Sequence, residues 1–263
     1  MTDPTPLDAA HAAMAAAPED DAARLRFYAR LVEAELYLLL EHEAEGEVLS
    51  PRLFDLEDGP VVLAFDREDR LAAFAGAPAP YAALPGRVVA RMLDGQGIGL
   101  GLNLEVAPSA MLLPPAAVDW LAGMLAQAPE ERDERPVEVF APGGLPEAVL
   151  AALDAALARA AGLATGVWLV AARFGDGREG HLLAFTDAAP GAEAALARAA
   201  GEALAFSGAE DLRIDVTFLD GGDPAAARIA RVGLRFDLTP PAAAPAPPRR
   251  APGSDPDAPP ILR

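Results

Sequence analysis

The sequence predicts an α+β protein of two domains followed by a tail. Short apolar runs typical of strands alternate along the chain with segments in which apolar residues recur at helical spacing. Residues 130–136 interrupt this alternation, because they hold charged residues and no apolar side chain except that of Pro136. Such a segment is typical of a linker between domains. The 263 residues, 52% of them hydrophobic, suffice for two hydrophobic cores of ordinary size.

The first domain is expected to span residues 1–129 as a small mixed sheet with helices packed on it. Apolar runs bounded by charged or turn-forming residues predict strands at residues 35–40, 60–65 and 111–113. Helical spacing predicts helices around the apolar residues of 7–14, 25–32, 71–74, 88–93 and 118–125. Residues 75–83, which are rich in proline and alanine, are expected to form a loop that leads to a helix with Pro85 in its first turn.

The second domain is expected to span residues 137–239 and to be a ferredoxin-like α+β sandwich. Its predicted elements follow the order βαββαβ: strand 137–140, helix 146–161, strands 167–174 and 181–186, helix 192–206 and strand 213–219. A short helix and an extra strand at residues 233–238 complete it. The octapeptide AALARAAG occurs at residues 155–162 and again at 194–201, at matching places in the two halves. Residues 240–263 are dominated by proline and alanine and are expected to be a disordered tail.

The stretch GQGIGLGLNL, from Gly95 to Leu104, raises the question of a phosphate-binding loop. Neither register of its glycines places a third glycine where a dinucleotide fingerprint requires one, and the chain has no lysine for a Walker loop. We therefore expect a strand. In a strand, Ile98, Leu100, Leu102 and Leu104 share one face, and Gly97, Gly99, Gly101 and Asn103 share the other.

The glycine-lined face allows two interpretations, because glycine inside a strand permits close approach of another group. We expect a helix packed tightly on the sheet. The alternative is a flat site for a small ligand beside Gly97, Gly99, Gly101 and Asn103, the candidate site residues of this chain.

Composition and charge disfavour several classes of function. A net charge of -19 opposes contact with a nucleic-acid backbone. The absence of cysteine removes thiolate nucleophiles and thiolate metal sites. The three histidines lie in separate segments, and no serine lies in the setting of a nucleophile elbow, so we expect no catalytic residues, no metal site and no cofactor. No secretory signal or membrane span is predicted, and a cytoplasmic location is expected.

Three blocks of the chain resemble the N-terminal domain of the SseB family, whose name is associated with enhanced serine sensitivity. They read FYARLVEAELYLLLE from Phe27, VVLAFDREDRLAAFAG from Val61 and GLGLNLEVAPSAMLLPPAAVDWL from Gly99. The last block departs from the family pattern of Asn-Pro-Gly after its apolar strand, because it keeps Asn103 but has Leu104 and Glu105 in place of the other two. Residues 137–238 are similar to the companion C-terminal domain. The resemblance implies the fold and brings no active site with it.

Together these observations predict a non-enzymatic cytoplasmic protein that acts through protein–protein contacts, in regulation or in stress and amino-acid tolerance. Its partner is then another protein, and neither nucleic acid nor membrane is expected to bind. The alternative is a sensor that holds a small, amino-acid-like molecule at the glycine-lined face.

Overall fold

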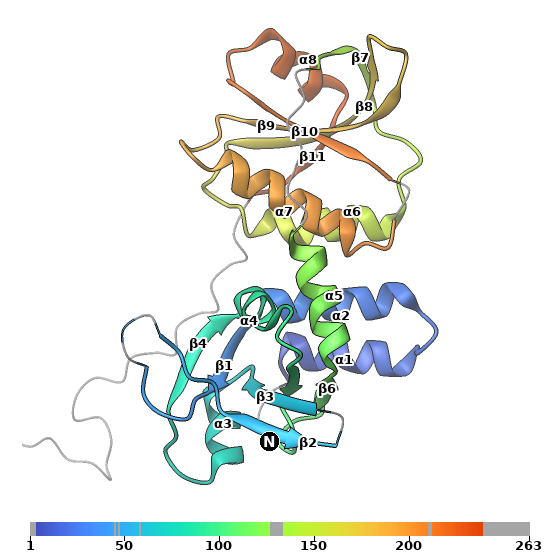
Figure 1. Ribbon diagram of the computed structural model, residues 1–263. Coiled ribbons are helices and arrows are strands. Elements are labelled where there is room, and N and C mark those ends of the chain that lie inside the picture. Colours follow the sequence, from blue (N-terminus) through green and yellow to red (C-terminus); the bar gives the residue numbers. More distant parts are fainter. Residues whose placement is uncertain are drawn as a thin grey trace, which may run out of the picture.

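The computed structural model describes residues 4–44, 46, 48–57, 59–126, 134–209 and 212–238, and it contains two sheets, each with helices packed on it (Figure 1). The predicted α+β class is confirmed. We use "first domain" for residues 4–126 and "second domain" for residues 134–238. Most of the expected linker and all of the expected tail, residues 130–133 and 240–263, lie outside the described residues, so those boundaries stay predictions.

The first domain forms one mixed sheet. Its strands are β1 (Glu35–Leu39), β2 (Leu53–Leu56), β3 (Gly59–Phe65), β4 (Tyr81–Pro85), β5 (Gly99–Leu102) and β6 (Met111–Leu113). Its helices are α1 (Pro6–Ala16), α2 (Asp21–Glu33), α3 (Glu68–Ala75), α4 (Gly86–Leu93) and α5 (Pro115–Ala126). The strand order is β4-β1-β3-β5-β6, with β2 also paired to β3, and the only parallel pair among these strands is β3 with β5.

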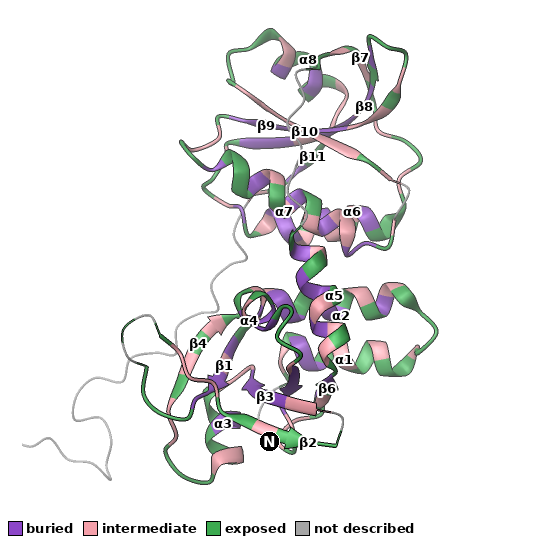
Figure 2. Cartoon of the chain, in the orientation of Figure 1, coloured by how far each residue is buried: buried purple, intermediate pink, exposed green. Residues whose placement is uncertain are grey.

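Two clusters of buried side chains cover the two faces of this sheet. Leu36, Leu38, Leu100 and Leu102 project from one face into a core shared with α1, α2, α4 and α5. On the opposite face, residues of β3 pack with α3 through Leu71. Figure 2 shows the same division, with buried residues on the strands and on the inner sides of the helices.

Local sequence explains where the first two helices begin. The Thr5 hydroxyl accepts a hydrogen bond from the Asp8 N–H, and the Asp8 carboxylate accepts one from the Thr5 N–H, which together form a capping box ahead of Pro6. The Asp20 carboxylate caps α2 by accepting from the Ala22 N–H. From these starts α1 and α2 run side by side, and side chains of both helices enter the core of the first domain.

The structure adds two strands that the sequence pattern did not predict. Residues 75–83 were expected to form a loop, but Tyr81–Pro85 pairs antiparallel with the whole of β1, and Pro85 both ends this strand and is the N-cap of α4. Residues Leu53–Leu56 pair with β3 as an exposed edge strand. Both are edge strands with few buried side chains, and this explains why they lack a clear apolar pattern.

The second domain contains a smaller sheet with α6 and α7 on one face and α8 on the other (Figure 1). Its strands are β7 (Pro136–Phe140), β8 (Gly166–Phe174), β9 (Glu179–Thr186), β10 (Ile214–Leu219) and β11 (Leu234–Phe236). Its helices are α6 (Glu147–Ala158), α7 (Glu193–Ala205) and α8 (Pro224–Val232). The predicted βαββαβ order and the extra strand are both present.

The strand pairing corrects the ferredoxin-like part of the prediction. In that fold the two strands of each βαβ unit are separated by a strand of the other unit. Here β9 lies directly beside β10 in parallel, and β7 pairs antiparallel with β8. The reason lies in β8, whose nine residues are long enough for two short strands along one edge. Residues 167–169 pair with β11 and residues 171–174 with β7.

Candidate functional site

The glycine-rich stretch forms a strand only at its centre. Gly95 and Gly97 have φ values of 67° and 66°, in the turn that follows α4, and β5 covers Gly99 to Leu102. Asn103 has a φ of 48°, and this left-handed conformation turns the chain away from the sheet. The four candidate site residues therefore do not share one strand face, because Gly97 and Asn103 lie outside β5.

The space beside the two strand glycines is filled by the first domain itself. A β-carbon at Gly99 would lie 2.7 Å from the Leu113 backbone oxygen, and one at Gly101 would lie 2.5 Å from the Leu63 Cδ2 atom. Leu104 also covers Gly101, although its predicted place was on the opposite face, because the turn at Asn103 reverses it. The closest contacts come from β6 and from the side chains of Val61, Leu63 and Leu104, while the helix that we expected contributes only Pro115, at the start of α5, beside Gly99. No open space for a ligand lies beside Gly99 or Gly101.

Asn103 belongs to a buried polar network at the ends of the parallel strands β3 and β5. Its side chain is fully buried, its Oδ1 atom accepts from the Asp66 N–H at 3.0 Å, and its Nδ2 atom donates to the Ser109 Oγ atom at 2.9 Å. Ser109 in turn donates to the Asp8 carboxylate at 2.5 Å. By accepting from the Asp66 backbone, Asn103 holds the end of β3 to the turn after β5.

The Arg70 guanidinium lies at the centre of this network. It donates to the Asp8 Oδ1 and Oδ2 atoms, at 3.1 and 2.5 Å, and to the Asp66 Oδ1 atom at 2.7 Å. The Thr5 hydroxyl donates to the other Asp66 oxygen at 2.6 Å. Among the described residues, no buried side-chain nitrogen or oxygen lacks a hydrogen-bond partner. The network is therefore closed on itself, and it joins α1, α3 and the ends of β3 and β5.

This network lowers the pKa of Asp8. Burial of the carboxylate raises its pKa, but the hydrogen bonds from Arg70, Ser109 and the Thr5 backbone outweigh that effect and hold the pKa well below the ordinary value. A group whose folded-state pKa is lowered stabilises the fold above its unfolded pKa and loses that contribution as the pH falls.

We therefore predict an acid-sensitive contribution from Asp8. The difference in unfolding free energy between the wild type and Asp8→Asn should be largest at neutral pH and should shrink as the pH falls below about 4, the ordinary pKa of aspartate. Urea denaturation at a series of pH values measures it. If the difference in unfolding free energy between the two proteins stays constant as the pH falls below about 4, the lowered pKa of Asp8 is contradicted.

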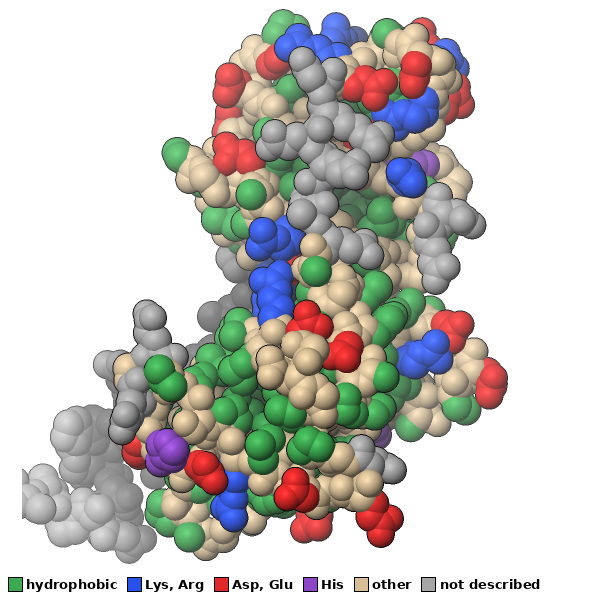
Figure 3. All heavy atoms as spheres, in the orientation of Figure 1, with side chains coloured by type: hydrophobic (Ala, Val, Ile, Leu, Met, Phe, Trp, Pro, Cys, Tyr) green, Lys and Arg blue, Asp and Glu red, His purple; other side chains and the backbone are tan. Residues whose placement is uncertain are grey.

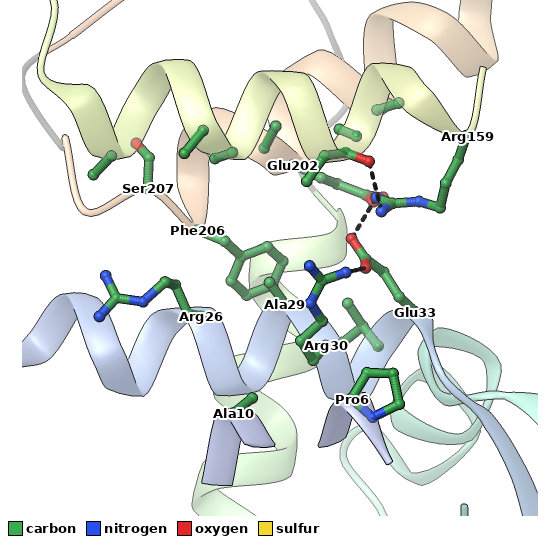
Figure 4. Close-up of a pocket in the computed structure, with 18 of the residues that line it drawn as sticks. Pro6, Ala10, Arg26, Ala29, Arg30, Glu33, Arg159, Glu202, Phe206 and Ser207 are labelled. Carbon is green, nitrogen blue, oxygen red and sulfur yellow. Dashed lines mark hydrogen bonds and ion pairs between the residues drawn. The ribbon is translucent and has the colours of Figure 1, made fainter. Parts of the chain in front are cut away.

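A groove of about 780 Å³ lies between the two domains (Figure 4). Helices α1 and α2 form the wall on the first domain, and α6 and α7 form the wall on the second. Alanine is the most frequent lining residue of both walls: Ala9, Ala10, Ala13, Ala22, Ala23 and Ala29 on one side, and Ala148, Ala151, Ala152, Ala155, Ala156, Ala160, Ala195, Ala199 and Ala203 on the other. Both copies of AALARAAG contribute residues to the second wall.

Charged side chains border one end of the groove and join the two domains there. Arg159 of the second domain pairs with Glu33 of α2, and Glu33 also pairs with Arg30. Arg87 of α4 pairs with Glu202 of α7 at 3.1 Å. In the close-up the side chains of Arg30, Glu33, Arg159 and Glu202 gather between α2 and the helices above it (Figure 4).

The arginines of these pairs are more exposed than their glutamate partners. The side chains of Arg30 and Arg159 are each 45% exposed against 21% for Glu33, and Arg87 is 34% exposed against 11% for Glu202. The rim therefore presents guanidinium groups to solvent, although the whole chain is strongly acidic. Basic side chains are also visible where the two domains meet in the space-filling view (Figure 3).

Phe206 fixes the second domain to the first at the end of α7. It is 5% exposed and belongs to the core cluster of the first domain, together with Phe27 and Leu31 of α2. The labelled ring points from α7 toward α2 and Ala29 (Figure 4). The groove is thus bounded by the apolar contact of Phe206 and by the ion pairs between the domains. These contacts fix the positions of the two walls and do not fill the space between them.

The geometry defines a two-domain α+β protein with an apolar groove between its domains. In comparisons with known proteins, residues 7–120 match the family model described as SseB protein N-terminal domain. No curated protein and no solved structure matches the chain. Residues 7–120 therefore form an SseB N-terminal domain, as the resemblance of the three sequence blocks implied, and the matched residues run from α1 into α5.

Sequence reasoning missed most of the residues that build these two features. Asp8, Arg70 and Ser109 are far apart in sequence, and no motif connects them. Alanine, which has no reactive group, makes up most of the residues that line the groove. The one available sign was the repeated octapeptide, because a helix with alanine on its exposed side has an unusually apolar surface. The described helices include none that is long and apolar enough to cross a membrane.

Proposed function

We propose that this protein is a non-enzymatic, cytoplasmic interaction module that binds a helix of a partner protein in the groove between its domains. The single observation that carries this proposal is the groove itself, whose walls are rich in alanine and come from four helices. A regulatory role, or one in stress and amino-acid tolerance, is carried out through that partner.

The walls of the groove favour a helical partner. Helix packing brings axes to within 8–10 Å, depending on the side chains at the contact. Alanine at most contact positions leaves the space for an inserted helix to come close to α2, α6 and α7. Recognition of an amphipathic helix in an apolar groove is a common mode of protein binding.

The rim indicates the charge of that partner helix. The exposed guanidinium groups of Arg30, Arg87 and Arg159 lie at one end of the groove, while their glutamate partners are turned inward. Arg26 adds a fourth cation along the wall, with its side chain 57% exposed. An apolar helix that carries aspartate or glutamate at one end complements this arrangement, since charge-assisted pairs with arginine are strong and directional.

A matched pair of variants tests the proposal. Ala195 lines the groove and Ala194 does not, although both lie exposed in the first turns of α7. In Ala195→Trp the indole occupies the groove, and we expect the variant to lose a partner that wild type and Ala194→Trp both retain from a lysate of the source organism. Equal thermal stability of the two variants controls for folding.

Two outcomes would contradict the proposal. One is that Ala195→Trp retains every partner of the wild type. The other is that no protein is retained and a small molecule, such as an amino acid, raises the melting temperature of the wild type but not of Ala195→Trp. The second result would assign the groove to a sensor instead.

A further inference from the structure

The β10 strand has an open edge at the end of the second sheet. It pairs with β9 along all six of its residues, and the described residues place no strand on its other side. Backbone N–H and C=O groups of one residue point to the same side of a strand, and successive residues alternate. The Leu219 C=O accepts from the Asp187 N–H beyond the end of β9, so residues 215, 217 and 219 face β9. Residues 214, 216 and 218 therefore face outward.

The other edge strands of the protein have features that discourage pairing, and β10 lacks them. Among the described strands, β2 has only four residues, β4 ends in Pro85, β6 and β11 have three residues each, and β7 begins with Pro136 and has a register shift. Short strands, prolines and irregularities protect sheet edges from association. β10 is six residues long and holds neither proline nor glycine. Its single charged residue, Asp215, is already paired with Arg178 at 2.9 Å.

We propose that β10 is the dimerisation surface of this protein and pairs antiparallel with β10 of a second copy, so that the two sheets become one. This inference does not depend on the groove. A two-fold axis through Val216 places Val216 opposite its own copy and Ile214 opposite Phe218 of that copy. All of these residues face outward, so each opposed pair can exchange two backbone hydrogen bonds.

The side chains of β10 are complementary in this register. Ile214, Val216 and Phe218 lie on the sheet face that carries the α6 and α7 core, and all three are only partly buried in the single chain. In the dimer, these three side chains and their copies form one apolar row across the two β10 strands. Cross-strand contacts of this kind stabilise antiparallel pairs. Asp215 lies opposite Thr217 of the second copy, so like charges do not meet.

The charge of the chain predicts the salt dependence of this dimer. Two chains of net charge -19 repel each other, and salt screens repulsion between exposed charges. We expect dimerisation to become stronger as the salt concentration rises, in contrast to an interface that depends on ion pairs.

Val216→Pro is the decisive variant. Proline removes an outward-facing N–H, which a strand edge tolerates, and leaves the pairing with β9 intact. Each dimer loses two hydrogen bonds, and we expect its dissociation constant to rise roughly tenfold or more, or about 1.4 kcal/mol. Val216→Thr keeps the N–H and the branched side chain, so it should dimerise like the wild type. Sedimentation of the full chain over a range of concentrations at low and high salt measures this.

Hydrogen exchange supplies a test that needs no variant. Amides of Ile214, Val216 and Phe218 should exchange more slowly as the concentration of the wild-type chain rises, while amides of Thr217 and Leu219 should not change. A wild type that remains monomeric in all conditions, a Val216→Pro variant that dimerises as strongly as the wild type, or exchange independent of concentration would each overturn the proposal.

Discussion

Replacement of Arg70 by alanine should destabilise the first domain by about 3–5 kcal/mol, because it leaves two buried carboxylates without their cation. Asp8 is 4% exposed, and the Asp66 side chain is 3% exposed. Both lose a charge-assisted hydrogen bond in Arg70→Ala. The free energy of unfolding from urea denaturation measures the effect.

A neighbouring arginine supplies the control for this prediction. Arg67 pairs with Asp69 at 2.8 Å, but both side chains are well exposed, at 36% and 52%. Exposed pairs of this kind contribute little, and Arg67→Ala should change the unfolding free energy far less than Arg70→Ala does. If Arg70→Ala is as mild as Arg67→Ala, the network has no structural role.

Gly86→Ala should be at least as damaging, since it puts a methyl group where the backbone of another helix lies. A β-carbon at Gly86 would lie 1.9 Å from the Leu31 backbone oxygen and 2.9 Å from the Leu31 carbonyl carbon. These atoms belong to α2 and cannot move without shifting that helix. Overpacking costs typically 1–3 kcal/mol and more where the backbone must move, so we expect about 3 kcal/mol or more. Thermal and urea denaturation of the variant measure it.

Gly123 in α5 is the matched control for Gly86. A β-carbon there would meet no atom of the described residues within 4 Å, and its backbone has no positive φ. Gly123→Ala should therefore stabilise the protein by about 0.5–1 kcal/mol, the usual gain from alanine in a helix. A Gly86→Ala variant that is as stable as Gly123→Ala would show that α4 does not pack against α2 as the structure places it.

The predicted fold followed from patterns that are local in sequence. The strands with continuous apolar runs, β1, β3, β8 and β9, were found because both of their faces are buried. β2 and β4 were missed because edge strands bury few side chains and need no such run. The ferredoxin-like pairing failed for a different reason. The order of elements does not determine which edge of β8 the first strand of the domain will use.

The glycine-rich stretch shows how far a strand pattern predicts a site. The alternation of glycine with apolar residues correctly placed Gly99 and Gly101 in a strand and disfavoured a phosphate-binding loop. It could not show that Leu104 turns back over Gly101, because that depends on the left-handed conformation of Asn103. It also could not show that the Asn103 side chain joins a network with residues from α1 and α3.

The groove could not be predicted from the sequence, because it exists only where two domains meet. Alanine is frequent in each wall, and a row of alanines on a single helix is typical of ordinary packing against a neighbouring element. The contacts that hold the walls in place join residues more than a hundred positions apart, as in the pairs of Arg87 with Glu202 and Arg159 with Glu33. Local patterns contain no information about such contacts.

Site-specific photo-crosslinking from the wall of the groove tests the central claim most directly. A photoreactive side chain at Ala195 faces the groove, and the same group at Ala194 does not line it. In cells of the source organism, we predict that position 195 forms an adduct with one protein, that the crosslinked segment of that protein is helical and acidic at one end, and that position 194 forms no such adduct. The same adduct from both positions, or none from position 195, would contradict the assignment of the groove as the binding surface.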